Sequence, residues 1–243
     1  MAKVRIQKVL AAAGIASRRA VEQMVLDGRI TVNGQTVTAL PCFVEPSDKI
    51  HVDGQTVAKR PAKLTYILLN KPRGVICTQR DEPGFDRPRA VDLVGRIGRR
   101  VYCVGRLDAD STGLIVLTND GELTDRLTHP RYGVVKTYIA RVAGRIETKD
   151  LAALRRGVFL DGGRTSRATV KVLRRGGNES LLELKICEGR NRQVRRTLSR
   201  LGHNVRRLHR SAVGPVTDSG LKIGKFRHLT AAEVASLTKA AGM

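Results

Sequence analysis

The first sixty residues carry two apolar stripes at helical spacing, one before Gly14 and one before Gly28. This spacing predicts two short helices. The apolar positions are Val4, Val9, Leu10 and Ala13 in the first helix and Val21, Met24 and Val25 in the second. Ser17 stands where a side-chain oxygen caps the second helix, and Gly28 stands just beyond its end.

The pattern then changes to alternation. In "RITVNGQTV", Ile30 and Val32 alternate with polar residues and lead into Asn33-Gly34, a pair that suits a two-residue hairpin turn. The phrase nearly recurs as "KIHVDGQTV" at residues 49–57. Because it occurs only twice, it favours two hairpin-like turns of one small domain over a solenoid.

From Tyr66 onwards the apolar runs lengthen, and "TYILLN" and "GVICT" are strand candidates on either side of "KPRG". The segment before them, "AKRPAK" at 58–63, has proline and charge without periodicity and predicts a linker. We therefore expect a small domain at 1–62 and a larger domain at 63–243. Further along, Val194, Leu198 and Leu201 predict the buried stripe of a helix.

The charge of the chain indicates its partner. Lys and Arg number 45 against 22 Asp and Glu, a formal charge of +23, and such a charge usually serves a polyanion. Nucleic acid is the leading candidate, since each neutralised phosphate releases counterions. An acidic membrane surface is the alternative, but no apolar run is long enough to span a bilayer. Aromatic content of 3% favours folded RNA over open single strands, which are bound by stacking.

Cysteine and histidine spacing excludes several site classes. The four cysteines form no CxxC pair, and the five histidines form no ligand pair, so a metal site is not expected. Each cysteine has apolar neighbours and is expected to be a small buried residue. A protein with free cysteines fits the reducing cytoplasm. As a separate expectation, the protein is a monomer.

The chemistry is concentrated in "VGRLDADSTGLIVLTND" at 104–120, where two acids lie in a polar loop between apolar runs. Asp108, Asp110 and Thr112 fit the start of a calcium loop, but its twelfth position is Asn119 instead of Glu, and the flanks look like strands. A two-metal nuclease using Asp108, Asp110 and Glu122 has few other acids nearby. A simple polar turn is the third alternative.

The motifs around this loop resemble a known family. "GRLDADSTGLIVLTND" resembles the active-site motif of pseudouridine synthases nearly letter for letter, and "LNKPRGV", "KTYIARV" and "EGRNRQVRRTL" match in the family's order. The N-terminal order of helix, Gly, "SRR", helix, "GR", strand and "VNG" resembles the S4 RNA-binding domain. Residues 3–235 therefore resemble S4-domain synthases that modify single uridines of bacterial ribosomal RNA. "EGRNRQVRR" looks more like the members acting on the large subunit.

The resemblance implies an α+β fold: a small helix-helix-hairpin S4 domain, and a catalytic domain with a mixed, mainly antiparallel sheet. The active cleft would run along that sheet with Asp108 at its centre. The reaction breaks the N1–C1′ bond of uridine, turns the base and rejoins it through C5. Since this is neither hydrolysis nor redox chemistry, no cofactor is implied.

The resemblance also assigns site residues. Asp108 would act at the ribose as nucleophile or base, which the sequence leaves open. Arg195 matches the arginine that pairs with this acid, and Tyr138 matches the tyrosine that stacks on the target base and can deliver or take a proton. For Tyr138 the alternative is a strand aromatic packed in the core. Asp110 is interpreted as loop structure only. Many relatives have His-Gln where this chain has Arg192-Gln193, which puts any histidine role there in doubt.

RNA contacts are expected from basic residues in two regions. A paired uridine must be flipped out to react, and Arg106 matches an arginine that relatives insert into the vacated space. The other expected contacts are Arg5, Lys8, Arg18, Arg19 and Arg29 in the first domain and Arg190, Arg192 and Arg196 in the second. Further arginines lie in the loop-like segment 79–100. The alternative function is a non-catalytic RNA-binding ribosome-assembly factor, which has no chemical need for Asp108, Tyr138 and Arg195 together.

Overall fold

The computed structural model describes residues 3–58, 63–78, 87–95 and 97–243. Most of the expected linker at 58–63, and Arg80 and Arg96 of the segment 79–100, therefore lie outside the described residues. The chain divides into two compact units. One comprises Met1–Leu64 with Arg96–Arg100, and the other Thr65–Gly95 with Val101–Met243.

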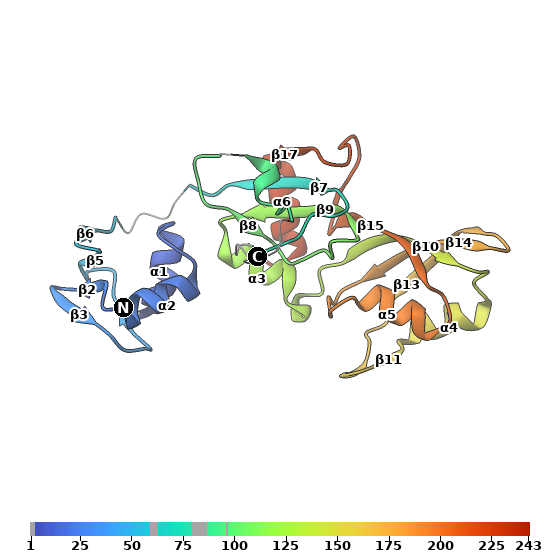
Figure 1. Ribbon diagram of the computed structural model, residues 1–243, viewed down its shortest axis with the longest axis horizontal. Coiled ribbons are helices and arrows are strands. Elements are labelled where there is room, and N and C mark those ends of the chain that lie inside the picture. Colours follow the sequence, from blue (N-terminus) through green and yellow to red (C-terminus); the bar gives the residue numbers. More distant parts are fainter. Residues whose placement is uncertain (1–2, 59–62, 79–86, 96) are drawn as a thin grey trace. The chain divides into compact units, whose positions relative to one another are not determined.

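The N-terminal unit packs two helices against a small antiparallel sheet (Figure 1). The helices are α1 (Ile6–Ala12) and α2 (Arg18–Leu26), and the sheet order is β3 (Gln35–Val37), β2 (Ile30–Val32), β5 (Ile50–Val52) and β6 (Gln55–Thr56). A separate pair joins β1 (Val4–Arg5) to β4 (Phe43–Val44). The core contains Ile6 and Leu10 of α1, Val21 and Val25 of α2, and Ile30 and Ile50 of the sheet.

Local signals in this unit are confirmed with one exception. The Ser17 hydroxyl accepts a hydrogen bond from the amide of Ala20 at 3.1 Å, as a helix cap does. The turns at Asn33-Gly34 and Asp53-Gly54 both have two residues with positive φ, which is the conformation of a type I′ hairpin turn. The expected helical position of Val4 is wrong. Val4 pairs with Val44 in a strand, so the first helix begins only at Ile6.

The larger unit is built on a mixed sheet, nine-stranded across the described residues. Its order is β13 (Thr169–Arg175), β14 (Glu179–Ile186), β10 (Lys136–Ala143), β15 (Val205–Val213), β9 (Thr112–Thr118), β7 (Tyr66–Lys71) and β17 (Phe226–His228). In addition, β16 (Val216–Thr217) pairs with β15 and β8 (Tyr102–Cys103) pairs with β9. Among the described residues the strands pair antiparallel except for β15 and β9, which confirms the mixed, mainly antiparallel sheet.

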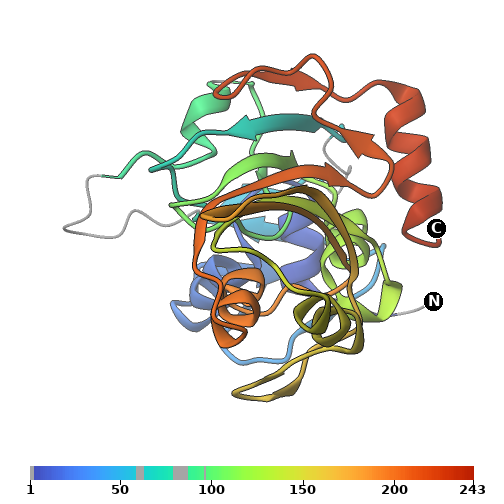
Figure 2. The same cartoon turned by 90° about the vertical axis from the view of Figure 1, so that its right-hand side faces the viewer.

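Helices cover both halves of this sheet. Figure 2 shows α4 (Thr148–Arg156) and α5 (Gln193–Arg200) on the same side of the curved strands β10, β13 and β14. Leu154 and Leu198 of these helices pack with Leu182 of β14. In the other half, α3 (Gly121–Thr128) and α6 (Ala231–Ala240) pack Leu123 and Leu237 against β7 and β9. Two short 3-10 helices, η1 (Asp92–Val94) and η2 (Pro130–Tyr132), and a hairpin of β11 (Phe159–Leu160) and β12 (Gly163–Arg164) complete the unit.

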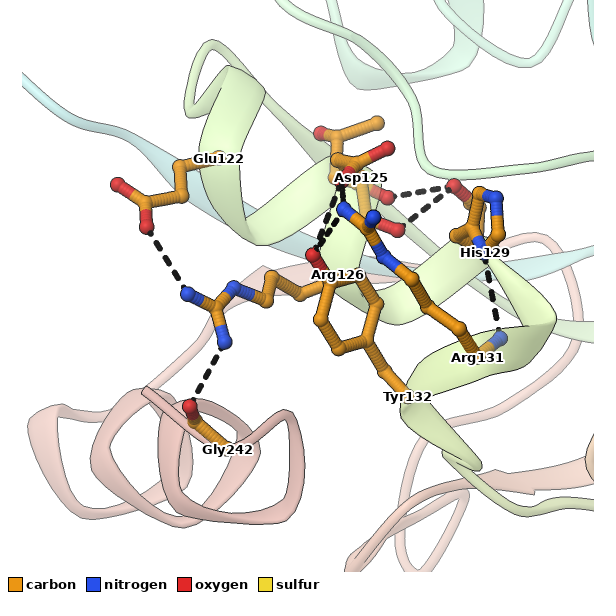
Figure 3. A network of polar contacts seen from close by, with 9 residues as sticks. Glu122, Asp125, Arg126, His129, Arg131, Tyr132 and Gly242 are labelled. Atoms are coloured by element: carbon orange, nitrogen blue, oxygen red, sulfur yellow. Dashed lines mark hydrogen bonds and ion pairs between the residues drawn. The ribbon is translucent and has the colours of Figure 1, made fainter.

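A polar network joins the C-terminal end of the chain to α3 (Figure 3). Arg126 donates a hydrogen bond to the carbonyl of Gly242 at 2.7 Å and pairs with Glu122 at 3.5 Å. Nearby, Arg131 contacts Asp125 and Tyr132. The network fixes the segment that leads from α3 into β10. In the described part of the chain, no helix is both long and apolar enough to cross a membrane.

Candidate active site

The loop that carries Asp108 connects β8 to β9 and is held by backbone contacts. The amide of Ser111 donates to the carbonyl of Asp108 at 3.0 Å, which closes the turn. The turn of "KPRG" supports it from outside, because the amide of Gly74 donates to the carbonyl of Ala109 at 2.7 Å. The amide of Leu107 donates to the sulfur of Cys77 at 3.4 Å. Contacts from the segment 74–77, which precedes the loop by about 30 residues in the chain, therefore hold the loop in place.

The residue that follows this loop, Gly113, has to be a glycine. It has a φ of +112°, and a Cβ there would lie 2.3 Å from the carbonyl oxygen of Arg210. Glycine is required because the backbones of β9 and β15 approach this closely. Thr112 and Gly113 here pair with His209 and Arg210, the parallel contact of the sheet. This contact brings the C-terminal part of the chain against the loop.

The centre of the site is a cluster of two carboxylates and two guanidinium groups. Arg192 lies 3.5 Å from Asp108, whose side chain is 28% exposed, and 3.2 Å from Asp110. Arg195 pairs with Asp110 at 3.3 Å, and its side chain is only 12% exposed. The four charged groups thus form one connected network in which Arg192 contacts both acids.

This arrangement differs from the expected pairing of Arg195 with Asp108. Among the described residues, the ion pair of Asp108 is with Arg192. Arg195 is committed elsewhere, because it donates to the carbonyls of Val205 at 3.0 Å and Asp110 at 3.2 Å and to the Ser111 hydroxyl at 3.3 Å. Asp110, interpreted from sequence as loop structure only, is therefore an ionic partner of both arginines.

Arg192 occupies a left-handed backbone conformation, with φ 47° and ψ 32°, at the N-terminal cap of α5. This conformation is uncommon for residues other than glycine, and such residues are concentrated at functional sites. It places Arg192 before the helix begins, although it is only three residues from Arg195. No sequence pattern indicated this conformation, and Arg192 was expected only to contact RNA.

The charges of the cluster perturb one another. Burial raises the pKa of Asp110, but the hydrogen bond from Arg192 and the charge of Arg195 outweigh this effect and leave the pKa below its ordinary value. Burial lowers the pKa of Arg195, and Asp110 opposes that shift.

Lys71, at the end of β7, is fully buried and donates to the carbonyls of Pro72 and Val75 at 2.9 and 2.8 Å. Burial lowers its pKa, and Asp108 and Asp110 both act in the opposite direction.

Lys71 is a residue of the site that sequence reasoning missed. The motif "LNKPRGV" was recognised as part of the family pattern, but no residue in it was assigned a role. A lysine at the end of an apolar strand run was the available signal, since buried lysines are rare unless they have partners.

Tyr138 lies on β10 at a register shift in the pairing with β15. It pairs with Arg210, which in turn pairs with Gly113, so β15 lies between Tyr138 and β9. Two strand spacings place the backbones of Tyr138 and Gly113 about 10 Å apart. The Tyr138 ring packs against the core beneath the sheet, and its hydroxyl has no hydrogen-bond partner among the described residues. Among the described residues, no hydrogen bond joins Tyr138 to Asp108.

The expected RNA-binding residues fall into two groups. One group is exposed and forms no ion pair with the described residues: Arg5, Lys8, Arg18, Arg19 and Arg106. The other group has protein partners. Arg29 binds Asp53 through two hydrogen bonds of 2.8 and 2.6 Å, and Arg196 pairs with Asp161 at 2.6 Å. Arg190 donates to the carbonyls of Gly162, Gly163 and Arg164.

The carboxylates weighed as metal ligands are not gathered in one place. Glu122 lies on α3, beyond the far end of the seven-residue strand β9, and pairs with Arg126. A strand of that length separates it from the loop by roughly 20 Å. Among the described residues, no group of three or more His, Cys, Asp or Glu could hold a metal ion.

The four cysteines are free and partly exposed, so the expectation that they are buried is wrong.

The fold and the site are those of an RNA-modifying class of enzyme, and comparison of the chain with known protein families identifies which one. Residues 65–200 match the family described as RNA pseudouridylate synthase, and residues 4–50 match the S4 domain. Since the first match covers more than half of the chain, the protein belongs to the RNA pseudouridylate synthase family. It is an S4-domain isomerase of α+β fold.

Relatives match over nearly the whole chain. It is 42% identical over 244 residues to "Uncharacterized RNA pseudouridine synthase" of Aquifex aeolicus, covering 100% of this chain and 97% of the relative. It is 43% identical over 235 residues to "Ribosomal large subunit pseudouridine synthase B" of Bacillus subtilis, covering 96% and 95%. A solved structure, "Crystal structure of pseudouridylate synthase", has a TM-score of 0.69 at 30% identity and covers 96% of this chain and 99% of its own.

Proposed function

We propose that this protein converts a specific uridine of bacterial ribosomal RNA to pseudouridine, with Asp108 acting at the ribose of a flipped-out nucleotide. The observation that carries the proposal is the Asp108 carboxylate, partly exposed on a fixed loop and paired with Arg192. A carboxylate in this position can attack C1′ or remove a ribose proton. The detached uracil then turns and C5 bonds to C1′. C5 loses its proton and N1 takes one up, so the product is an isomer of the substrate.

The arginines have distinct parts in this proposal. Arg192 sets a positive charge beside Asp108, which offsets the repulsion between the carboxylate and approaching RNA phosphates. Arg195 acts as a positioning residue, because it binds the loop through Asp110 and Ser111 and does not contact Asp108. Its side chain is mostly buried, so the guanidinium end of the ion pair is shielded from solvent, while Asp110 is 35% exposed.

Tyr138 and Arg106 complete the proposed machinery. The free hydroxyl of Tyr138 on β10 supports a role at the target base, on which its ring would stack. Arg106 is exposed and forms no ion pair with the described residues, which leaves it free to enter the space that the flipped base vacates. Both roles rest on the family motifs.

RNA binding by the first domain is supported by its uncompensated charge. Arg18 and Arg19 at the start of α2, and Arg5 and Lys8 around α1, are exposed and lack ion pairs with the described residues. We place the S4 domain at 1–62 and the catalytic domain at 63–243; the compact units divide the chain near residue 64, with Arg96–Arg100 grouped with the first unit. We further propose that the enzyme works as a monomer in the cytoplasm, where its RNA is found.

The large ribosomal subunit is the favoured source of the substrate, since a relative 43% identical to this chain is named for that subunit. The test uses the purified protein with 23S and 16S transcripts and with partly assembled subunits. Pseudouridine is mapped by carbodiimide modification and primer extension. A single new site in 23S RNA is expected. A site only in 16S RNA would overturn the subunit assignment, and no site in any substrate would overturn the enzymatic proposal.

A further inference from the structure

A cavity of about 960 Å³ lies between α5 and the β11–β12 hairpin. Its lining includes Asp110, Arg192 and Arg195 but neither Asp108 nor Tyr138. It therefore adjoins the acid–arginine cluster without being the place where the target ribose meets Asp108. Its volume is in the range of sites that hold small molecules and nucleotides.

One wall of the cavity is an exposed aromatic ring. Phe159 is 68% exposed, the highest value among the exposed large hydrophobic residues of the described chain. The guanidinium of Arg164 lies 5.6 Å from the ring centroid, so it covers one face of the ring. The same ring lines the cavity. An exposed aromatic ring beside basic residues is a stacking platform for a nucleobase.

The opposite wall is basic. Arg192, Arg196 and Arg200 recur every four residues at the start of and along α5, and all three line the cavity. Residues at this spacing share one face of a helix. Arg200 is exposed and forms no ion pair with the described residues. Arg196 pairs with Asp161, whose side chain is fully exposed, so solvent weakens the pair and a phosphate can replace the carboxylate.

Hydrogen bonds from Arg190, just before α5, hold the β11–β12 hairpin beside the helix. Arg190 donates to the carbonyl of Gly162 in the turn of the β11–β12 hairpin and to those of Gly163 and Arg164 in β12, at 2.8 to 3.2 Å. The hairpin is therefore fixed to the segment around α5, and Figure 1 shows β11 beside α5. A preformed site loses little conformational entropy when it binds a ligand.

We infer that this cavity binds a second nucleotide of the RNA substrate, other than the target uridine. Its base stacks on the open face of Phe159, and its phosphate binds Arg196 and Arg200. The inference rests on the proposed RNA substrate and extends it to a second extruded or unpaired nucleotide. Arg192 belongs to both sites, since it lines the cavity and contacts Asp108. Occupation of the cavity thus helps to place the RNA for the reaction.

The test measures RNA affinity and tritium release from 5-tritiated uridine in a series at position 159. Phe159→Ala is expected to raise the Kd and KM about tenfold with little change in kcat, because one base–aromatic stack is lost. Phe159→Trp should keep wild-type values, whereas Phe159→Leu, which keeps apolar volume without stacking, should resemble Phe159→Ala. Phe226→Ala is the matched control, since Phe226 lies on β17, is 40% exposed and does not line the cavity.

A crosslink identifies the occupant directly. With p-benzoylphenylalanine in place of Phe159, the crosslinked nucleotide is expected to differ from the modified uridine. A crosslink to the modified uridine itself would overturn the inference, as would unchanged RNA affinity in Phe159→Ala or full activity in Phe159→Leu. If the wild type releases no tritium while Phe159→Ala still weakens RNA binding, the proposed function fails and the nucleotide site stands.

Discussion

Two arginines share the two acids of the loop, and each contributes differently. Arg195 is mostly buried and binds Asp110, Ser111 and the carbonyl of Val205, so it fixes the loop to the segment after α5. Arg192 is more exposed and is the residue that contacts Asp108. Its left-handed backbone at the helix cap makes this contact possible. The loop is thus fixed through one acid, while the other remains accessible to substrate.

Asp110→Asn tests this division. The change leaves the partly buried guanidinium of Arg195 without an ionic partner, which costs about 1 to 3 kcal/mol in free energy of unfolding. Isomerisation should slow by about tenfold to a hundredfold through loss of loop geometry without being abolished. Thermal unfolding and single-turnover tritium release measure the two effects. Wild-type stability together with wild-type rate would show that the Asp110 pairs do not support the loop.

Sequence motifs predicted which residues gather at this site better than they predicted how the residues pair. Asp108, Arg195 and Arg192 were all singled out, and the structure brings them together. Their pairing depends on the left-handed conformation of Arg192 and on the distant carbonyl of Val205. Neither can be read from residue spacing. Likewise Arg29 and Arg190 were expected to face RNA, but Arg29 binds Asp53, 24 residues away, and Arg190 donates to the carbonyl of Arg164, 26 residues away.

At the scale of elements, the close contact of β9 and β15 positions the loop. Gly113→Ala should destabilise the protein by more than about 3 kcal/mol, because the new Cβ would overlap the backbone of Arg210. Gly133→Ala is the matched control, since Gly133 also has a positive φ but open space around its Cβ. Its cost should be about 1 to 2 kcal/mol from backbone strain alone. Thermal and urea unfolding compare the two, and equal losses would contradict a steric requirement at Gly113.

The N-terminus of α6 gives the fold a predictable pH dependence. Arg227 and the capping contacts with Thr230 lower the pKa of Glu233 from 4.5 to about 2. Because the folded-state pKa lies below the unfolded one, the stabilisation is complete above the unfolded pKa and is lost as the pH falls through the folded pKa. Glu233→Gln should therefore cost about 1 kcal/mol at neutral pH, with a difference from wild type that shrinks as the pH falls below about 4.

Urea titrations across this pH range test the sign. Glu122→Gln is the control, since Glu122 is 66% exposed and its contact with Arg126 is 3.5 Å long. A difference between wild type and Glu233→Gln that grows as the pH falls would show that the carboxylate is not stabilised in its charged form.

Local elements were predictable from sequence, whereas long-range pairings were not. The Ser17 cap and the turn at Asn33-Gly34 depend on neighbouring residues, and both are confirmed. Val4 was assigned to a helix because its spacing fits, but pairing with Val44, forty positions away, places it in a strand. The parallel pairing of β9 with β15 and the β11–β12 wall of the cavity also depend on distant partners, so no local pattern indicated them.

At the scale of the whole molecule, the net charge of +23 is the dominant property. Changing Arg18 and Arg19 together to Ala should weaken RNA binding uniformly and reduce the slope of log K against log salt by about 1 to 2. A charge-matched control changes Arg131 and Arg174, which already pair with Asp125 and Glu179. Filter binding across a salt series measures the slopes. An equal change in both double variants would show that net charge alone, and not the face of α2, sets the affinity.

The chemical role of Asp108 is the central claim, and tritium release from ribosomal RNA transcripts carrying 5-tritiated uridine tests it most directly. Wild type, Asp108→Asn and the control Phe226→Ala are compared in EDTA under single-turnover conditions, with RNA affinity measured in parallel. Tritium release is expected with wild type and with Phe226→Ala. No release is expected with Asp108→Asn, which should still bind RNA with nearly unchanged affinity. Release by Asp108→Asn at the wild-type rate would contradict the claim, because the isomerisation would then proceed without the carboxylate.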